Sequence, residues 1–206
     1  TPPDTITDDG KLIRFNGTGK RGTTKNSWYV LHGDGIPSGV FGDWAGTDPI
    51  KWTGKPDNAM TEAERQAVLA RMEDAKEQRA KQTERKHANA QTAAAGFAEG
   101  SDPATPDHPY LASREVQPHG LRVHGTSLVM PLYDMDGELW SVQFITSYGD
   151  KKFLPEGRVA GCFYPIGKSN GTTVICEGFA TGASIREATG LAVLVAHSAG
   201  NLKAVA

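Results

Sequence analysis

A glutamate placed at the end of an apolar run constrains the fold of this chain more than any other feature. Residues 173–176 are apolar or β-branched, Glu177 and Gly178 follow at once, and a second, nearly continuous apolar run covers residues 191–196. Two such runs joined by a short segment predict a strand–helix–strand unit with parallel strands and a right-handed crossover. Because ligands bind outside the carboxyl ends of strands in open α/β sheets, Glu177 is placed for chemistry.

The segment between the two runs predicts a short helix. Thr181 or Gly182 is expected to open this helix, since Thr is a competent N-cap, and Gly190 suits the residue just past its end. The residues that would lie on the sheet are small or apolar, namely Ala183, Ile185 and Ala188. A second strand-to-helix turn is expected beyond the second run, at Ser198, Gly200 and Asn201.

These residues, with several upstream segments, form a set that points to a known family. The C-terminal part of the set consists of Glu177, Gly178, Thr181, Gly182, Ala196, Ala199, Gly200, Asn201 and Leu202. The upstream parts, in the family's order, are residues 10–15, 28–32, 42–44, 108–111, 118–122, 131–144 and 161–163. Together they resemble the DNA primases and primase-helicases of phages and plasmids, and the C-terminal part resembles the first half of their Toprim domain.

The resemblance implies roles for individual residues. Glu177 would act as the acid/base that takes a proton from the attacking 3′-hydroxyl; the alternative is a strand-end carboxylate that caps a helix. Backbone N–H groups at Gly178, Thr181 and Gly182, near a helix N-terminus, would bind phosphate. Ser198, Gly200 and Asn201, in the turn after the second strand, would line the same crevice at the carboxyl ends of the strands. The alternative for both sets is turn geometry alone.

The metal site that the resemblance implies is only partly present. Toprim enzymes pair the glutamate with an Asp-x-Asp motif on a later strand, and these carboxylates hold Mg²⁺ or Mn²⁺. The sequence ends at Ala206 before such a motif, and Thr1 is not an initiator methionine. We therefore expect a truncated amino-terminal fragment in which Glu177 is a partial metal site. Asp134-x-Asp136 does not replace the motif, because Asp136-Gly137 between strand-like runs is typical of a hairpin turn.

Composition limits the compartment and the partners. The net charge is −2, so attraction to nucleic acid must be local. The two cysteines, Cys162 and Cys176, lie in or beside apolar runs and suit reduced core positions in a cytoplasmic protein. The resemblance implies that this is the cytoplasm of a bacterial host. No run approaches the ~20 apolar residues of a membrane span, so no membrane partner is expected.

Three parts follow one another along the chain, and the expected fold class is α+β or α/β. Residues 1–58 predict a small β-rich module. Residues 59–99 predict a long polar helix, opened by a capping box of Thr61 and Glu64. Its second half is almost wholly polar, so the helix is expected to be a solvated connector and not a core helix. Residues 107–206 form the catalytic side, with a truncated Toprim-like, Rossmann-like βαβ domain over about 172–206.

The first module is a candidate for binding single-stranded nucleic acid without zinc. Residues 11–33 contain no acidic residue, and basic and aromatic residues are interleaved among them. Proteins that bind single strands use basic side chains to contact phosphates and aromatic side chains to stack on bases. The candidate binding residues are Lys11, Arg14, Lys20, Arg21, Lys25, Trp28 and Tyr29. The alternative is a solvated loop beside a few core aromatics. No cysteine precedes Cys162, so a zinc ribbon is not expected in this module.

The predicted function is that of a mobile-element DNA primase, a nucleotidyltransferase that makes short primers on single-stranded DNA. The partners implied by the resemblance are the DNA template, nucleoside triphosphates and a replicative helicase, fused or separate. The fragment alone is expected to be inactive. Two alternatives remain: a Toprim-type nuclease fragment, and a non-enzymatic module that binds DNA or a protein partner.

Overall fold

The computed structural model describes residues 5–17, 25–44, 47–169 and 171–206. The chain divides into two compact units, Thr1–Gln78 and Arg79–Ala206, and the boundary falls inside one long helix, α1 (Glu62–Gly100). We describe each unit separately. No helix in the described part of the chain is both long and apolar enough to cross a membrane.

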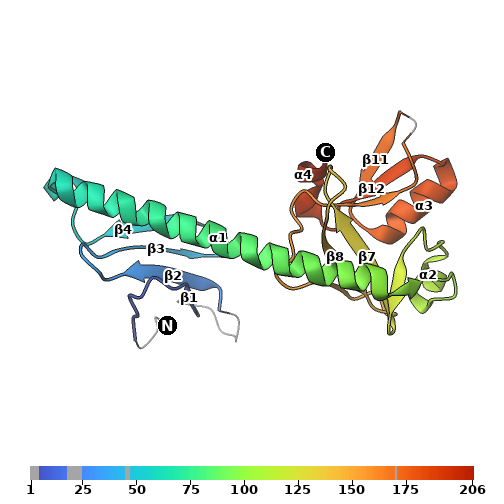
Figure 1. Ribbon diagram of the computed structural model, residues 1–206, viewed down its shortest axis with the longest axis horizontal. Coiled ribbons are helices and arrows are strands. Elements are labelled where there is room, and N and C mark those ends of the chain that lie inside the picture. Colours follow the sequence, from blue (N-terminus) through green and yellow to red (C-terminus); the bar gives the residue numbers. More distant parts are fainter. Residues whose placement is uncertain (1–4, 18–24, 45–46, 170) are drawn as a thin grey trace. The chain divides into compact units, whose positions relative to one another are not determined.

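The first unit is built on a four-stranded antiparallel sheet in the order β1-β2-β3-β4 (Figure 1). Its strands are β1 (Ile13–Phe15), β2 (Ser27–His32), β3 (Ser38–Asp43) and β4 (Thr47–Thr53). Across the sheet, Tyr29 pairs with Ile13 on one side and with Phe41 on the other, and Phe41 pairs with Ile50. Since side chains alternate between the faces of a strand, this apolar row occupies one face, and Arg14 and Trp28 lie on the other.

The start of α1 confirms the predicted capping box. The carboxylate of Glu64 accepts from the backbone N–H of Thr61 at 2.7 Å, and the Thr61 hydroxyl accepts from the Glu64 N–H at 3.3 Å. Lys55 also donates to Glu64 at 2.7 Å and, with Thr61, lowers the pKa of that carboxyl to about 2. A short 3₁₀ turn at Asp57–Ala59 precedes the helix.

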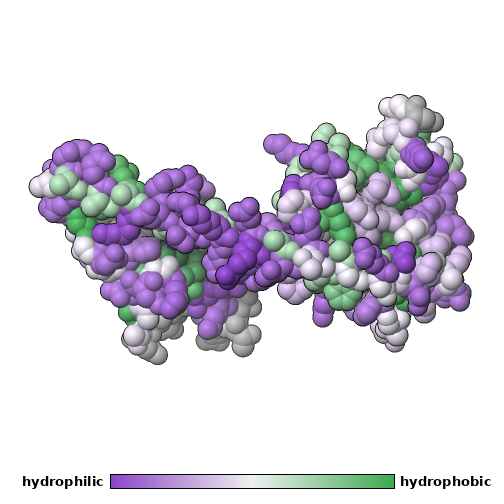
Figure 2. Space-filling model, in the orientation of Figure 1, coloured by the Kyte–Doolittle hydropathy of each residue, from purple (hydrophilic) through white to green (hydrophobic). Residues whose placement is uncertain are grey.

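The second half of α1 differs from the sequence prediction. The exposed stretch covers residues 76–85, in the middle of the helix, where hydrophilic residues cover its surface (Figure 2). Ala90 and Ala94 are buried farther on, and Ala94 forms a small core with Val129 and Val142. The prediction of a solvated connector holds for residues 76–85 and was wrong for the part of the helix that carries Ala90 and Ala94, because alanine was counted as part of a polar run. A methyl side chain instead lets the helix lie close to the sheet beneath it.

The second unit holds a five-stranded antiparallel sheet in the order β5-β6-β7-β8-β9. Its strands are β5 (Asp102–Pro103), β6 (Arg122–His124), β7 (Ser127–Tyr133), β8 (Leu139–Ile145) and β9 (Lys151–Phe153), with α2 (Pro109–Arg114) between β5 and β6. The connection from β7 to β8 is the predicted turn: the Gly137 N–H donates to the Asp134 carbonyl at 3.1 Å, and Gly137 has a φ of 81°. Asp134 also accepts from the Trp140 indole at 2.6 Å, so this Asp-x-Asp serves the hairpin.

The second sheet of this unit has the order β10-β12-β11 and contains the strand–helix–strand segment (Figure 1). Its elements are β10 (Tyr164–Ile166), β11 (Thr173–Cys176), α3 (Phe179–Thr189) and β12 (Ala192–Val195). β11 and β12 are parallel, and Cys176 pairs with Val195. A 3₁₀ turn (Ala199–Asn201) and the short helix α4 (Leu202–Val205) follow β12.

The helix α3 begins earlier than the sequence predicted. Gly178 is its N-cap residue, with extended backbone, and Phe179 is the first helical residue, fully buried. The start at Thr181 or Gly182 was therefore wrong, because burial of Phe179 draws the chain into the helix two residues sooner. The predicted end is confirmed: Gly190 has a φ of 71°, and its N–H donates to the Arg186 carbonyl.

Candidate functional site

The Glu177 carboxylate lies free at the edge of the parallel strand pair. Glu177 is exposed and directly follows β11, while the Ala196 N–H donates to the Cys176 carbonyl at 2.8 Å and keeps the end of β12 alongside. Within the described part of the chain, the Glu177 side chain makes no hydrogen bond or ion pair. A carboxylate without a protein partner at this edge is available to a ligand.

The first turn of α3 begins beside this carboxylate. As a glycine, Gly178 has no side chain with which to cap the helix, so N–H groups of the first turn have no cap from that residue. Thr181 is exposed in the same turn. Gly182 instead faces the sheet, since an added Cβ would lie 2.9 Å from Val195 Cγ2 and 3.0 Å from Cys176 Sγ. Of the three predicted phosphate residues, Gly182 therefore has a packing role.

The turn after β12 holds one residue that is fully engaged by the fold. Asn201 is buried, and its Nδ2 donates to the carbonyl oxygens of Cys162 at 2.8 Å and Ala196 at 2.9 Å. Its side-chain amide is therefore engaged inside the protein and is not available to a ligand. Gly200 is exposed and Ser198 half-buried, so these two predicted residues are the ones that remain at the surface of the turn.

Sequence reasoning missed His197, the first residue after Ala196. His197 is only 7% exposed, and both of its ring nitrogens are buried without a hydrogen-bond partner. Its backbone φ of 69° lies in the left-handed region, and its ring meets Phe153 edge-on at a centroid distance of 6.2 Å. Burial, with a smaller contribution from the charge of Lys151, lowers the pKa of His197 to about 4. The imidazole is therefore neutral near pH 7.

Lys151 brings a positive charge to the same edge from the five-stranded sheet. Its Nζ lies 3.4 Å from the position that a Cβ on Gly178 would take. Its charge acts on both His197 and Cys176, although burial dominates at Cys176 and raises the pKa of that thiol. The strand-end edge therefore combines a free carboxylate, a lysine, a buried histidine and a helix N-terminus.

In the first unit, the structure brings together only some of the predicted nucleic-acid-binding residues. Arg14 pairs with Trp28 in the sheet register, and Trp44 joins them: the two indole rings are 5.6 Å apart, and the Arg14 guanidinium lies 5.9 Å from the Trp44 ring centre. Tyr29 lies on the opposite face, near Phe15. The prediction had grouped Trp28 with Tyr29.

The remaining basic residues of that set are dispersed. Lys11 is paired with Asp9 at 2.7 Å, and Lys25 is exposed. Lys20 and Arg21 lie outside the described residues. Arg14 is therefore the basic residue that the structure associates directly with aromatic rings.

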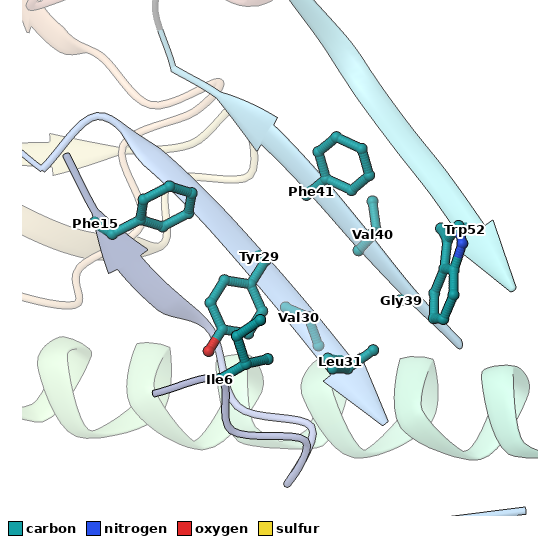
Figure 3. Close-up of a pocket in the computed structure, with 9 residues that line it drawn as sticks. All are labelled: Ile6, Phe15, Tyr29, Val30, Leu31, Gly39, Val40, Phe41 and Trp52. Carbon is teal, nitrogen blue, oxygen red and sulfur yellow. The ribbon is translucent and has the colours of Figure 1, made fainter. Parts of the chain in front are cut away.

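An apolar groove of about 440 Å³ lies in the first unit (Figure 3). It is lined by Ile6, Phe15, Tyr29, Val30, Leu31, Gly39, Val40, Phe41 and Trp52. None of these lining residues carries a charge, so the groove lacks the cations that a phosphate backbone requires. We assign it no part in binding nucleic acid.

The described residues contain no ready-made metal centre. No group of three or more His, Cys, Asp or Glu side chains among them is arranged to hold an ion. Cys162 and Cys176 are both free and buried. Among the described residues, Glu177 alone supplies a free carboxylate at the strand-end edge, and a hard divalent cation takes six or more oxygen ligands.

Comparison with known proteins points to DNA primases. The chain is 33% identical to each of two Escherichia coli proteins named DNA primase TraC, and the alignments cover 96% of this chain. They cover 19% and 14% of those proteins, so the chain spans at most about a fifth of the length of these curated relatives. No family model matches the chain, and no solved structure matches it.

Over nearly all of its own length, the chain is similar to proteins named DNA primase. The similarity runs through the β-rich unit, the long helix and the strand–helix–strand segment, since it spans nearly all of the chain. It supports the primase part of the resemblance seen in the sequence. The Toprim assignment and the residue roles remain proposals.

Proposed function

We propose that this chain is part of a mobile-element DNA primase that makes short primers on single-stranded DNA. The observation that carries the proposal is the unpartnered, exposed carboxylate of Glu177 at the carboxyl end of β11, beside the parallel strand β12. The similarity to proteins named DNA primase over 96% of the chain supports the same reaction class. A Toprim-type fold for residues 172–206 is part of this proposal.

In the proposed reaction, Glu177 is the general base. The 3′-hydroxyl oxygen of the growing primer attacks the α-phosphorus of a nucleoside triphosphate, and the bond from that phosphorus to the pyrophosphate leaving group breaks. The hydroxyl proton passes to the Glu177 carboxylate. A positioned base contributes ~10²–10⁴-fold to such transfers. The exposure of Glu177 and its lack of a partner leave it ready to accept a proton.

Mg²⁺ or Mn²⁺ belongs to the proposed reaction as the ion that neutralises phosphate charge. Within the described residues, the strand-end edge supplies one free carboxylate to such an ion, and that is too few ligands to hold it. The residues here therefore do not make a complete metal site, and we derive no step through the metal. Glu177 is the residue of this chain that would contribute to it.

The template-binding part of the proposal rests on Arg14, Trp28 and Trp44. Trp44 is 61% exposed and lies near both the Arg14 guanidinium and the Trp28 ring. Exposed indoles stack on bases without regard to sequence, and a neighbouring guanidinium pairs with phosphate. This surface is the part of the first unit that fits single-stranded DNA.

The test is primer synthesis by the complete gene product that contains this chain, with single-stranded DNA, Mg²⁺ and all nucleoside triphosphates. Glu177→Gln is expected to reduce product by ~10²-fold or more, because it removes the base while keeping the side-chain shape. Glu138→Gln, which changes an exposed glutamate in the β7–β8 turn, is the matched control and should leave product unchanged.

The other outcomes identify the alternatives. Full activity of the Glu177→Gln protein would overturn the role of this residue. DNA cleavage without primer synthesis would indicate a nuclease, and binding of single-stranded DNA with neither reaction would indicate a binding module. A replicative helicase as partner is tested by adding one to the same assay and measuring primer yield.

A further inference from the structure

Tyr148 is the most exposed large hydrophobic side chain in the described part of the chain. It is 94% exposed, and the next most exposed, Met135, reaches 75%. Tyr148 lies in the turn between β8 and β9. Turns usually take Gly, Asn, Asp, Ser or Pro for backbone reasons, and an aromatic ring almost wholly in water adds nothing to the packing of this one. The ring is therefore available to a partner.

The backbone of this turn is held in place by hydrogen bonds. The Thr146 N–H donates to the Asp150 carbonyl at 2.9 Å, and the Gly149 N–H donates to the Thr146 carbonyl at 2.9 Å. The Ser147 hydroxyl donates to the carbonyl of Thr126, in the turn between β6 and β7, at 3.2 Å. A side chain carried on a preorganised turn loses little further conformational freedom when it binds.

A guanidinium lies beside the same turn. The Tyr110 ring of α2 lies 3.5 Å from the position that a Cβ on Gly149 would take. The Arg114 guanidinium lies over that ring, at 5.8 Å from its centre. Arg114 is exposed, so its planar charged group faces solvent within reach of a ligand on Tyr148.

Positive charge is in excess around the turn. Lys151 and Lys152 follow it directly, and both are exposed. Neither lysine, nor Arg114, forms an ion pair with a carboxylate of the described residues. The acidic neighbours in the sequence are Glu115 and Asp150, so the cations outnumber them.

The same hairpin leads from Tyr148 to the strand-end edge. Lys151 Nζ lies 3.4 Å from the position that a Cβ on Gly178 would take, and Gly178 directly follows Glu177. Lys151 is three residues from Tyr148, which corresponds to about 11 Å of extended chain at most. A nucleic-acid strand whose end lies at Glu177 can therefore reach Tyr148 within a few nucleotides.

We propose that Tyr148 stacks on an unpaired base of the nucleic-acid strand that is presented to Glu177, and that Arg114 pairs with a phosphate of that strand. Surfaces that bind single strands combine aromatic rings with cations, because every base has a face on which a ring can stack. A guanidinium matches the geometry of a phosphate group. The identity of the strand as template or primer rests on the proposed function, whereas stacking on Tyr148 is a property of this chain.

The surroundings of Tyr148 favour nucleic acid over a protein partner. Protein interfaces have an apolar core, depleted of charge, inside a polar rim. In the described part of the second unit, Met135 is the only other exposed large hydrophobic residue, and it lies in the turn at the opposite end of β8. A lone ring among cations fits one stacked base better than an apolar interface.

The decisive experiment is an NMR titration of this 206-residue chain, ¹³C-labelled on its five tyrosine rings, with a short oligodeoxyadenosine. The Tyr148 signal is identified as the one missing from the Tyr148→Leu variant. We expect this signal to shift saturably, because a stacked purine changes the magnetic environment of the ring. An unmoved Tyr148 signal at saturation would overturn the proposal and leave the ring to a protein partner.

Affinities measured by fluorescence anisotropy test the energetic role of the ring. They are compared in a Trp44→Ala background, so that the proposed surface of the first unit does not mask the effect. Tyr148→Leu should weaken binding ~5- to 150-fold, the range for loss of one stacked base, and Tyr148→Phe should stay within about twofold. Met135→Ala is the matched control, because it removes another exposed apolar side chain from a hairpin turn. Equal losses in Tyr148→Leu and Met135→Ala would overturn the proposal.

The role of Arg114 is tested through salt. Arg114→Gln should lower the slope of log affinity against log salt by ~0.7, as expected for one phosphate contact with a single strand. Lys168→Gln is the matched control, because Lys168 is an exposed cation that precedes β11, at the end of that strand opposite Glu177. A slope lowered equally in both variants would overturn the phosphate contact.

The two hypotheses can fail separately. A Tyr148 response to the oligonucleotide without primer synthesis by the complete protein would keep the stacking site and remove the primase reaction. Primer synthesis by a complete protein whose Tyr148→Leu variant has an unchanged KM for template would keep the reaction and remove the stacking site.

Discussion

The side chain of Asn201 is hydrogen-bonded to the backbone of Gly161, which lies forty residues earlier in the sequence: its Oδ1 accepts from the Gly161 N–H at 2.8 Å. Its Nδ2 donates at the same time to the carbonyl oxygens of Val159, Cys162 and Ala196. One buried amide thus ties the segment before β10 to the end of β12. The edge that carries His197 and Ser198 depends on this connection.

Asn201→Ala is therefore expected to destabilise the second unit strongly. The change leaves a buried N–H and several buried carbonyls unpaired, and each costs ~1–3 kcal/mol, so we expect a loss of about 3 kcal/mol or more in the free energy of unfolding. Chemical denaturation checks this value. Asn201→Asp should cost at least as much, because a carboxylate oxygen would face three carbonyls. Gly200→Ala, where nothing lies within 4 Å of an added Cβ, should change stability by no more than ~0.5 kcal/mol.

Two glycines in helices should respond in opposite ways to the same substitution. Gly182→Ala places a methyl 2.9 Å from Val195 Cγ2 and 3.0 Å from Cys176 Sγ, and overpacking of this kind costs ~1–3 kcal/mol. Gly96→Ala in α1 meets nothing within 4 Å and should stabilise by ~0.5–1 kcal/mol through helix propensity. Thermal unfolding of both variants measures the contrast. A neutral Gly182→Ala would show that α3 can move off the sheet.

Local signals in the sequence predicted several elements well. The Thr61–Glu64 capping box, the Asp-Gly turn after β7 and the Gly190 helix end each depend on residues within a few positions of one another. The strand–helix–strand segment was also predictable, because apolar runs of strand length can be recognised in the sequence without knowledge of tertiary contacts. These features specify where Glu177 lies.

Other features depend on contacts that the sequence does not display. β4 contains Pro49 and Asp48, which a central strand avoids and an edge strand tolerates, so its sequence gives no clear strand pattern. Trp28 and Tyr29 were grouped by adjacency, whereas strand alternation sends them to opposite faces. His197 lies near β9 only through the fold, where its ring meets Phe153, and no local sequence pattern predicts that contact.

The Trp44 surface of the first unit makes a prediction about binding of single-stranded DNA. Trp44→Ala should weaken binding to a labelled oligothymidine by ~1–3 kcal/mol, which is the range for loss of one stacked base. Trp52→Ala is the control, because Trp52 is 49% exposed but lies in the uncharged groove on the other side of the sheet. Fluorescence anisotropy measures both affinities. Equal losses would place the DNA on the groove instead.

Arg14→Gln extends the same prediction to charge. Removing one phosphate contact should lower the slope of log affinity against log salt by ~0.7 for a single strand. Anisotropy titrations at several salt concentrations give that slope. An unchanged slope would show that the Arg14 guanidinium serves only to hold Trp44.

The buried imidazole of His197 predicts how acid affects stability. Its pKa is about 4 in the folded chain, against 6.5 for a free histidine side chain, so the unfolded state binds the proton more readily. His197 contributes no pH dependence above about pH 6.5, and it destabilises the fold progressively as the pH falls from there towards 4. The loss reaches about 2–3 kcal/mol at pH 4.5, since each pKa unit corresponds to ~1.4 kcal/mol.

Urea unfolding at pH 7 and pH 4.5 tests this, with His197→Gln for comparison. Carboxylates such as Asp134, whose pKa is lowered mainly by the Trp140 indole, also lose stability in acid, but they do so equally in both proteins and cancel in the difference. We expect the variant to lose about 2–3 kcal/mol less than the unmodified chain between the two pH values. The same loss in both would mean that His197 gains a partner for its proton in solution, and that its ring is not held in the neutral form.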